Sequence, residues 1–218
     1  MKTTLLWLLM LCCFPLFGSE NYEHFLWNRG EITLTDKSVV KGLVGYDHTQ
    51  GVVMVTSKNG VTKAFSPHKV QHFTFFDDIL SIERLYVSLS VPQKRKAPQL
   101  YFFEVVMDGT FAILRREKKY ANIKMTLTVG NNGGDFARHA ACFDYYAFSD
   151  GEFYSMMDFE EKLYPKLLEY NETAIENLVT EKELDIRYLN HQILVLDFYN
   201  SLREENYKRL QLAQAVQG

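Results

Sequence analysis

The chain has 218 residues, of which 47% are hydrophobic and 23% are charged. This is ordinary usage for a globular protein, and it excludes a chain that is disordered throughout. The formal net charge of −3 at pH 7 gives no reason to expect a nucleic-acid partner. Aromatic residues make up 14% of the chain, which favours β-structure because Tyr and Phe suit half-buried pleated surfaces.

The first eighteen residues differ in composition from the rest of the chain. Lys2 precedes an apolar run over residues 5–17, and the small residues Gly18 and Ser19 follow that run. This pattern is typical of a signal peptide, which we place at residues 1–18. The alternative is an uncleaved N-terminal anchor. We therefore expect a periplasmic or secreted protein that has no integral membrane span after the signal is removed.

The three cysteines bear on the same question. Cys12 and Cys13 raise a lipoprotein interpretation, but Leu11 rather than a small residue precedes Cys12, so we do not expect lipoprotein anchoring. Only Cys142 remains in the mature chain, so no internal disulfide is possible. The exported domain must therefore be stabilised by its apolar core.

Residues 19–157 are predicted to form an antiparallel β-rich domain. Asn59-Gly60 is a strong hairpin signal, because both residues tolerate positive φ. Asp108-Gly109 and Asp150-Gly151 mark two further hairpins, and the basic segment 91–98 is predicted as a loop between prolines. Predicted strands cover residues 32–34, 40–46, 52–56, 61–65, 70–76, 82–89, 100–107, 111–115, 123–129, 142–148 and 152–156.

Residues 158–210 follow a helical period instead. Asp158 with Glu161, and Thr173 with Glu176, are N-terminal capping patterns. Pro165 should end or bend the first helix. The last helix carries an apolar stripe, formed by Leu189, Ile193, Leu196 and Tyr199. Residues 211–218 are predicted as a flexible tail. The predicted fold class is α+β, an antiparallel β-barrel or sandwich with a C-terminal three-helix segment packed on it.

Several segments resemble a class of exported proteins from Bacteroidota that are largely uncharacterised. The resemblance lies in Gly30-Glu-Ile-Thr-Leu-Thr-Asp36, in residues 40–47, in Phe65-Ser-Pro-His-Lys-Val-Gln-His-Phe73 and in Asp197-Phe-Tyr-Asn-Ser-Leu202. It covers most of the mature chain, but these motifs are turn and core patterns. It implies an envelope or secreted setting and no particular activity.

Two groups of residues could carry out catalysis or bind a metal, and each has a simpler interpretation. Cys142 could be a nucleophile with His139 and Asp144, or a buried apolar thiol. His68 and His72 follow His48 and precede Asp77 and Asp78, but spacing on a strand does not bring such groups together as a helix would. We therefore expect no catalytic residues, no metal and no cofactor, and a hydrolase at either place is the less favoured alternative.

Surplus aromatic residues and two basic clusters predict a contact surface instead. Consecutive rings place side chains on both faces of a strand, and one face must then meet the helices or a partner. The candidate binding residues are Tyr101, Phe103, Lys94, Arg95, Lys96, Arg115, Arg116 and Tyr145. The sequence thus predicts an exported, non-catalytic binding or structural protein of the cell envelope. Its partner would be an envelope protein, or alternatively a small apolar ligand carried inside the sheet.

Overall fold

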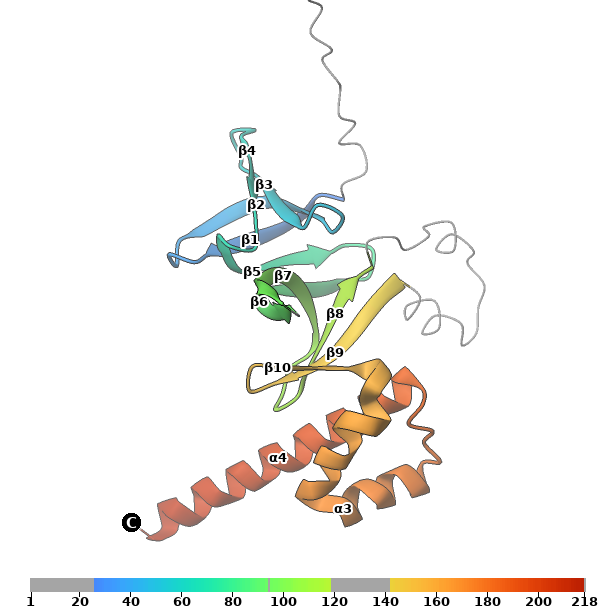
Figure 1. Ribbon diagram of the computed structural model, residues 1–218. Coiled ribbons are helices and arrows are strands. Elements are labelled where there is room, and N and C mark those ends of the chain that lie inside the picture. Colours follow the sequence, from blue (N-terminus) through green and yellow to red (C-terminus); the bar gives the residue numbers. More distant parts are fainter. Residues whose placement is uncertain (1–25, 94, 119–141, 218) are drawn as a thin grey trace, which may run out of the picture.

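The computed structural model describes residues 26–93, 95–118 and 142–217, with side chains as far as residue 205. Its described residues form one ten-stranded antiparallel sheet followed by helices (Figure 1). The strands are β1 (Asn28–Leu34), β2 (Val39–Asp47), β3 (Val52–Thr56), β4 (Thr62–Phe65), β5 (Val70–Asp77), β6 (Ile82–Gln93), β7 (Lys96–Met107), β8 (Ala112–Glu117), β9 (Phe143–Ser149) and β10 (Glu152–Ser155). Their order in the sheet is β10-β9-β8-β7-β6-β5-β1-β2-β3-β4.

This arrangement confirms the predicted α+β class, with an antiparallel sheet and a C-terminal helical segment. The sheet is open, because β4 and β10 stand at its two ends, so it corresponds to the sandwich-like alternative. Positive φ at Asp150 (51°) and Gly151 (83°) fits the predicted hairpin between β9 and β10. The predicted strand at 123–129 lies outside the described residues.

One loop prediction was wrong. Residues 91–98 were predicted as a loop, but β6 runs on to Gln93 and β7 begins at Lys96. Val91 pairs with Gln99 across this hairpin. Arg95 makes the tight turn possible by adopting a positive φ of 62°. The two prolines are tolerated because they do not interrupt the regular pairing from Leu85 to Ser90.

The helical segment begins with a 3-10 turn, η3 (Met156–Asp158), and a π-turn, η4 (Phe159–Leu163). Helix α3 (Tyr164–Glu181) follows, with Pro165 in its first turn, so this proline starts a helix and does not end one. A kink at Asn171 (φ −159°, ψ 78°) divides α3. The amide oxygen of Asn171 accepts a hydrogen bond from the backbone N–H of Ala174, so Asn171 caps the second part.

Helix α4 (Leu189–Gln217) closes the chain and runs through most of the segment predicted as a tail. Its Asn200 is clamped to the β7–β8 turn: its amide oxygen accepts from the Phe111 N–H at 2.9 Å, and its amide nitrogen donates to the Phe111 carbonyl at 3.0 Å. Gly109 permits this approach, because a Cβ there would lie 2.4 Å from the Asn200 amide nitrogen. None of the helices in the described part is long and apolar enough to cross a membrane.

The described residues form two apolar cores. The first lies within the sheet, where strands β1–β7 bring together Ile32, Val44, Val53, Val55, Val70, Phe73, Phe75, Tyr86 and Phe102. The second lies between strands β8 and β9 and the helices, and includes Ile113, Tyr145, Ala147, Phe159, Leu163, Leu167, Ile175 and Leu196. Figure 1 shows the helices beside β8–β10, away from β1–β4. The first core is thus covered by the curl of the sheet itself, and the second is covered by the helices.

Candidate functional site

A hollow of a size suited to a small ligand lies where strands β2, β7 and β8 approach one another. It has a volume of about 480 Å³. Its walls are Tyr46, the β2–β3 turn at 48–52, the β4–β5 turn at 66–68, residues 99–102 of β7, and the end of β8 at 116–117. We call it the β2/β8 cavity. Its volume falls in the range of small-molecule sites, and its lining mixes aromatic with polar groups.

An ion pair joins two walls of the β2/β8 cavity. Nδ1 of His48 lies 2.7 Å from the Glu117 carboxylate, and both side chains are about three-tenths exposed or less. The hydrogen bond to Glu117 raises the pKa of His48 above its ordinary value, although burial opposes this. The Glu117 charge is therefore paired whenever His48 is protonated.

Arg116 and Tyr101 form a second pair in the lining. The guanidinium carbon of Arg116 lies over the Tyr101 ring, 4.5 Å from its centroid, and 5.7 Å from the centroid of Phe103. The Tyr101 hydroxyl donates to the Gln99 side-chain oxygen at 2.8 Å. Stacking of this kind positions the cation and stabilises it by about 0.5–2 kcal/mol.

Tyr46 forms the aromatic wall of the same cavity. Its ring centroid lies 5.1 Å from that of Tyr86 and 5.7 Å from that of Phe102. Burial raises the pKa of Tyr46 far above its usual value, the charge of Glu117 raises it further, and Arg116 opposes the rise. The Tyr46 hydroxyl thus stays neutral at physiological pH and can donate a hydrogen bond.

A buried charge cluster lies on the face of the sheet that carries both cores. Cross-strand pairing places Phe73, Tyr86, Glu104, Arg115 and Tyr145 in one row, which runs from the first core to the second. Cross-strand partners share a face of the sheet. Glu104 is only 5% exposed, and it stands in the middle of this row.

Two arginines neutralise Glu104. Arg84 donates to its two carboxylate oxygens at 2.9 and 2.7 Å, and Arg115 donates at 2.7 and 2.9 Å. Burial alone would raise the pKa of Glu104, but the hydrogen bonds and charges of the two arginines lower it. Such bidentate pairing satisfies the buried carboxylate. We assign this cluster a structural role, because its donors and acceptors are already occupied by one another.

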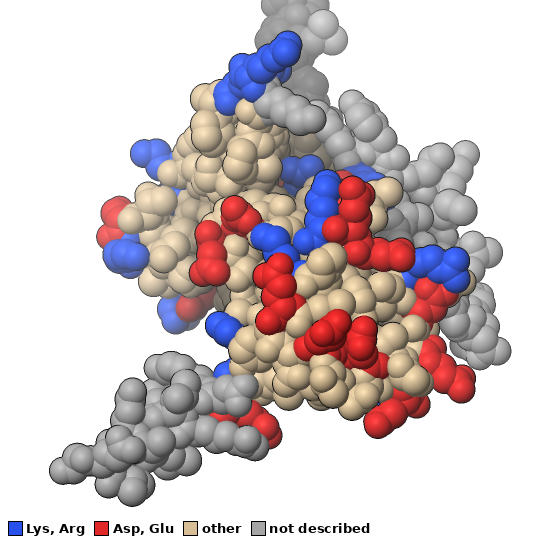
Figure 2. Space-filling view, turned by 60° about the horizontal axis from the view of Figure 1, so that its bottom comes forward, with Lys and Arg blue, Asp and Glu red and all other residues tan. Residues whose placement is uncertain are grey.

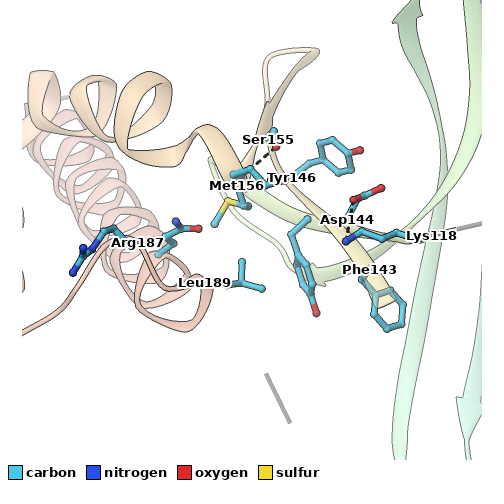
Figure 3. Close-up of a pocket in the computed structure, with 11 residues that line it drawn as sticks. Lys118, Phe143, Asp144, Tyr146, Ser155, Met156, Arg187 and Leu189 are labelled. Atoms are coloured by element: carbon cyan, nitrogen blue, oxygen red, sulfur yellow. Dashed lines mark hydrogen bonds and ion pairs between the residues drawn. The ribbon is translucent and has the colours of Figure 1, made fainter. Parts of the chain in front are cut away.

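A smaller pocket of about 170 Å³ lies between β9, η3 and the start of α4 (Figure 3). Met156 and Leu189 line it, and Lys118 lies 3.7 Å from Asp144 on its other side. This volume is below the usual range of small-molecule sites. We therefore regard the β2/β8 cavity as the better candidate.

The structure distributes the predicted binding residues over several environments. Phe103 (1% exposed) and Tyr145 (8%) are buried, against the β9–β10 rings and in the helix-facing core respectively. Arg115 is held by Glu104. Arg95 and Lys96 are exposed at the β6–β7 turn, and Lys94 lies outside the described residues. Only Tyr101 and Arg116 are brought together in the lining of a cavity.

Sequence reasoning named His48 only beside His68 and His72, and it missed the pairing of His48 with Glu117. The two are 69 positions apart in the chain, and their contact depends on how far the sheet curls. Their positions gave a weak signal, because His48 directly follows β2 and Glu117 is the last residue of β8. Charged groups at strand ends are common, however, and no local pattern says which of them will meet.

The alternatives for catalysis gain little from the geometry. Cys142 is half-buried before β9, Asp144 is near Lys118, and His139 lies outside the described residues. His68 is exposed in the β4–β5 turn, and His72 is on β5. In the parts of the chain that the structure describes, no group of three or more His, Cys, Asp or Glu side chains could hold a metal ion.

No protein family, no curated protein and no solved structure was found to match this chain.

Proposed function

We propose that this protein is an exported, non-catalytic binding protein of the cell envelope, and that it holds a small ligand in the β2/β8 cavity. The observation that carries the proposal is the cavity itself, with about 480 Å³ of space and a lining drawn from four separate segments. Binding sites of this type are concave and combine apolar walls with a few polar groups that orient the ligand.

The mixed lining favours an amphipathic ligand over a wholly apolar one. Tyr46, Leu100 and Phe102 supply apolar surface, whereas His48, Gln99 and Arg116 supply hydrogen-bonding groups. A purely apolar ligand would leave these polar groups without partners and would bind less well for that reason. We therefore propose a carrier or sensor of a small amphipathic molecule in place of a carrier of a wholly apolar ligand.

The proposed location comes from residues 1–18, whose basic start, apolar run and small residues are those of an export signal. The resemblance to exported proteins of Bacteroidota supports an envelope setting.

Native mass spectrometry of the protein purified from its own cells tests the proposal. We expect a bound species that denaturation releases. In the variant Gln50→Trp, an indole at the exposed edge of the cavity should lower the occupancy, whereas the control Gln50→Ala should retain it. Repeated absence of any bound species from the folded wild-type protein would contradict a ligand-holding role.

A further inference from the structure

Arg116 differs from the other two arginines of the central strands. Arg84 and Arg115 donate to Glu104, whereas Arg116 makes no hydrogen bond or ion pair within the described residues. Its side chain is half-buried, and it is held over the Tyr101 ring. A guanidinium has five N–H donors at the edge of its plane, in a fork that matches a carboxylate or phosphate group. Arg116 is therefore a positioned cation whose donors are not taken up by the described residues.

The acidic group beside Arg116 does not cancel this cation. Glu117 is paired with His48 at 2.7 Å, and Asp47 accepts from the backbone N–H and hydroxyl of Thr49 in its own turn. With His48 protonated, Glu117 is paired, and Asp144, the cross-strand partner of Arg116, lies 3.7 Å from Lys118. Asp47 keeps its charge beside the lining. An anion entering the cavity would meet the guanidinium of Arg116 and the neutral donors of Tyr46 and Gln99.

Charge is also divided unevenly over the whole molecule. Residues 26–118 contain thirteen Lys or Arg and nine Asp or Glu, whereas residues 156–205 contain five and twelve. Figure 2 shows the acidic side chains gathered over the helical end that comes forward in that view. This distribution directs anions away from the helices and toward the strands that surround the β2/β8 cavity.

We infer that the ligand of the β2/β8 cavity is a small organic anion, whose carboxylate or phosphate oxygens accept hydrogen bonds from Arg116 while its organic body lies against the neighbouring lining of the cavity. The inference rests on the proposed function, since it names the ligand class of the same cavity. The apolar walls select an anion that carries an organic body over a bare inorganic ion.

Three probes of similar size test this by NMR titration of the purified protein: benzoate, phenyl phosphate and benzamide. Benzamide is the neutral counterpart of benzoate. We expect at least one of the two anions to bind the cavity roughly tenfold or more tightly than benzamide, because a charge-assisted hydrogen bond is worth about one factor of ten or more. The two anions together distinguish a carboxylate ligand from a phosphate ligand.

Three variants locate the effect. Arg116→Gln should reduce anion affinity to that of benzamide, and Arg116→Lys should restore part of it as a point charge without the fork. The control Arg95→Gln removes the same charge from the exposed β6–β7 turn and should change affinity less than twofold. A thermal melt of each variant shows that it is folded before its affinity is compared.

The outcomes separate the two proposals. If benzamide binds the cavity as tightly as both anions, or if Arg116→Gln retains anion binding, the anion inference is wrong and the ligand-holding function stands. If none of the three probes perturbs the signals of residues that line the cavity, the inference is overturned together with the proposed site. Selective loss in Arg116→Gln supports both.

Discussion

The two halves of the sheet bury the same face by different means. In the first half, strands β1–β7 curl so that Ile32, Phe73 and Phe102 pack against one another, without side chains from the described helices. In the second half, Ile113 and Ala147 are covered by Leu163 and Leu196 from the helices. Between the two halves lies a part of this face that is covered neither by the curl of the sheet nor by the helices, and we call it the junction. That junction holds the Glu104 cluster, and at its edge lies the β2/β8 cavity.

The composition of each core follows from how it is closed. The curled sheet is rich in Val, Phe and Tyr, which suit pleated surfaces, and its rings stack, as Phe73 and Tyr86 do at 4.7 Å. The helix-covered core draws on Leu, Ile and Met from turns of a helix. The predictions below test whether the two halves depend on the junction, from the largest expected effect to the smallest.

The largest effect should come from the junction itself. Replacing Glu104 with Gln leaves Arg84 and Arg115 without their shared carboxylate in a largely buried position. We expect the free energy of unfolding to fall by about 3–5 kcal/mol, as is usual when one member of a buried ion network is removed. Urea denaturation measures it. The control Glu31→Gln removes an exposed partner of Lys41 and should cost less than about 1 kcal/mol.

A core substitution in the helix-covered half comes next. Leu163→Ala opens a space between the helical segment and the sheet, where Leu163 is completely buried. The expected loss is about 2–5 kcal/mol. Tyr fluorescence and far-UV circular dichroism should lose signal at the same urea concentration. Two separate transitions would mean that the halves fold independently across the junction.

The clamp between α4 and the β7–β8 turn should have a moderate effect. Asn200→Ala leaves the N–H and the carbonyl of Phe111 without their side-chain partner. We predict a loss of about 1–3 kcal/mol in urea denaturation. Ser201→Ala is the control, because its hydroxyl donates only to the nearby Phe198 carbonyl on an exposed surface. Equal losses in the two variants would show that the clamp contributes nothing.

The smallest effect concerns pH. The pKa of His48 is raised in the folded protein by its hydrogen bond to Glu117. A raised folded-state pKa stabilises the protein fully below the unfolded value near 6.5, and this stability is lost as pH rises through the folded value. NMR titration of the imidazole should give a midpoint above 6.5, and Glu117→Gln should lower it. The other charged or titratable groups in this lining are Tyr46, His68, Tyr101 and Arg116. Asp47, beside the lining, also raises the pKa of His48. An unchanged midpoint in Glu117→Gln would contradict the assignment.

The sequence was informative where structure is local. Alternation and turn residues predicted the strands that became β1–β5, and Asn59-Gly60 lies in the turn between β3 and β4. The contact between Tyr101 and Arg116 was within reach too, since Tyr101 lies in a predicted hairpin and Arg116 directly follows that hairpin. Each of these features lies within one strand or one hairpin.

The remainder depended on long-range packing. Phe103 and Tyr145 were predicted as exposed contacts, but whether a ring on a two-faced strand is covered depends on distant elements such as β10 and the helices. The curl that joins His48 to Glu117, and the charge row through Glu104, likewise depend on sheet order and twist. Neither is encoded in a local pattern.

The central claim is that the junction between the two halves forms a ligand site at the β2/β8 cavity. The most direct measurement is the pattern of backbone amide shifts when benzoate is added to the wild-type protein. The account predicts that the perturbed signals cluster at Gly51, Gln99 and Glu117, which come from three walls of the cavity. Shifts confined to Met156 and Leu189 in the smaller pocket, or no localised shifts at all, would contradict it.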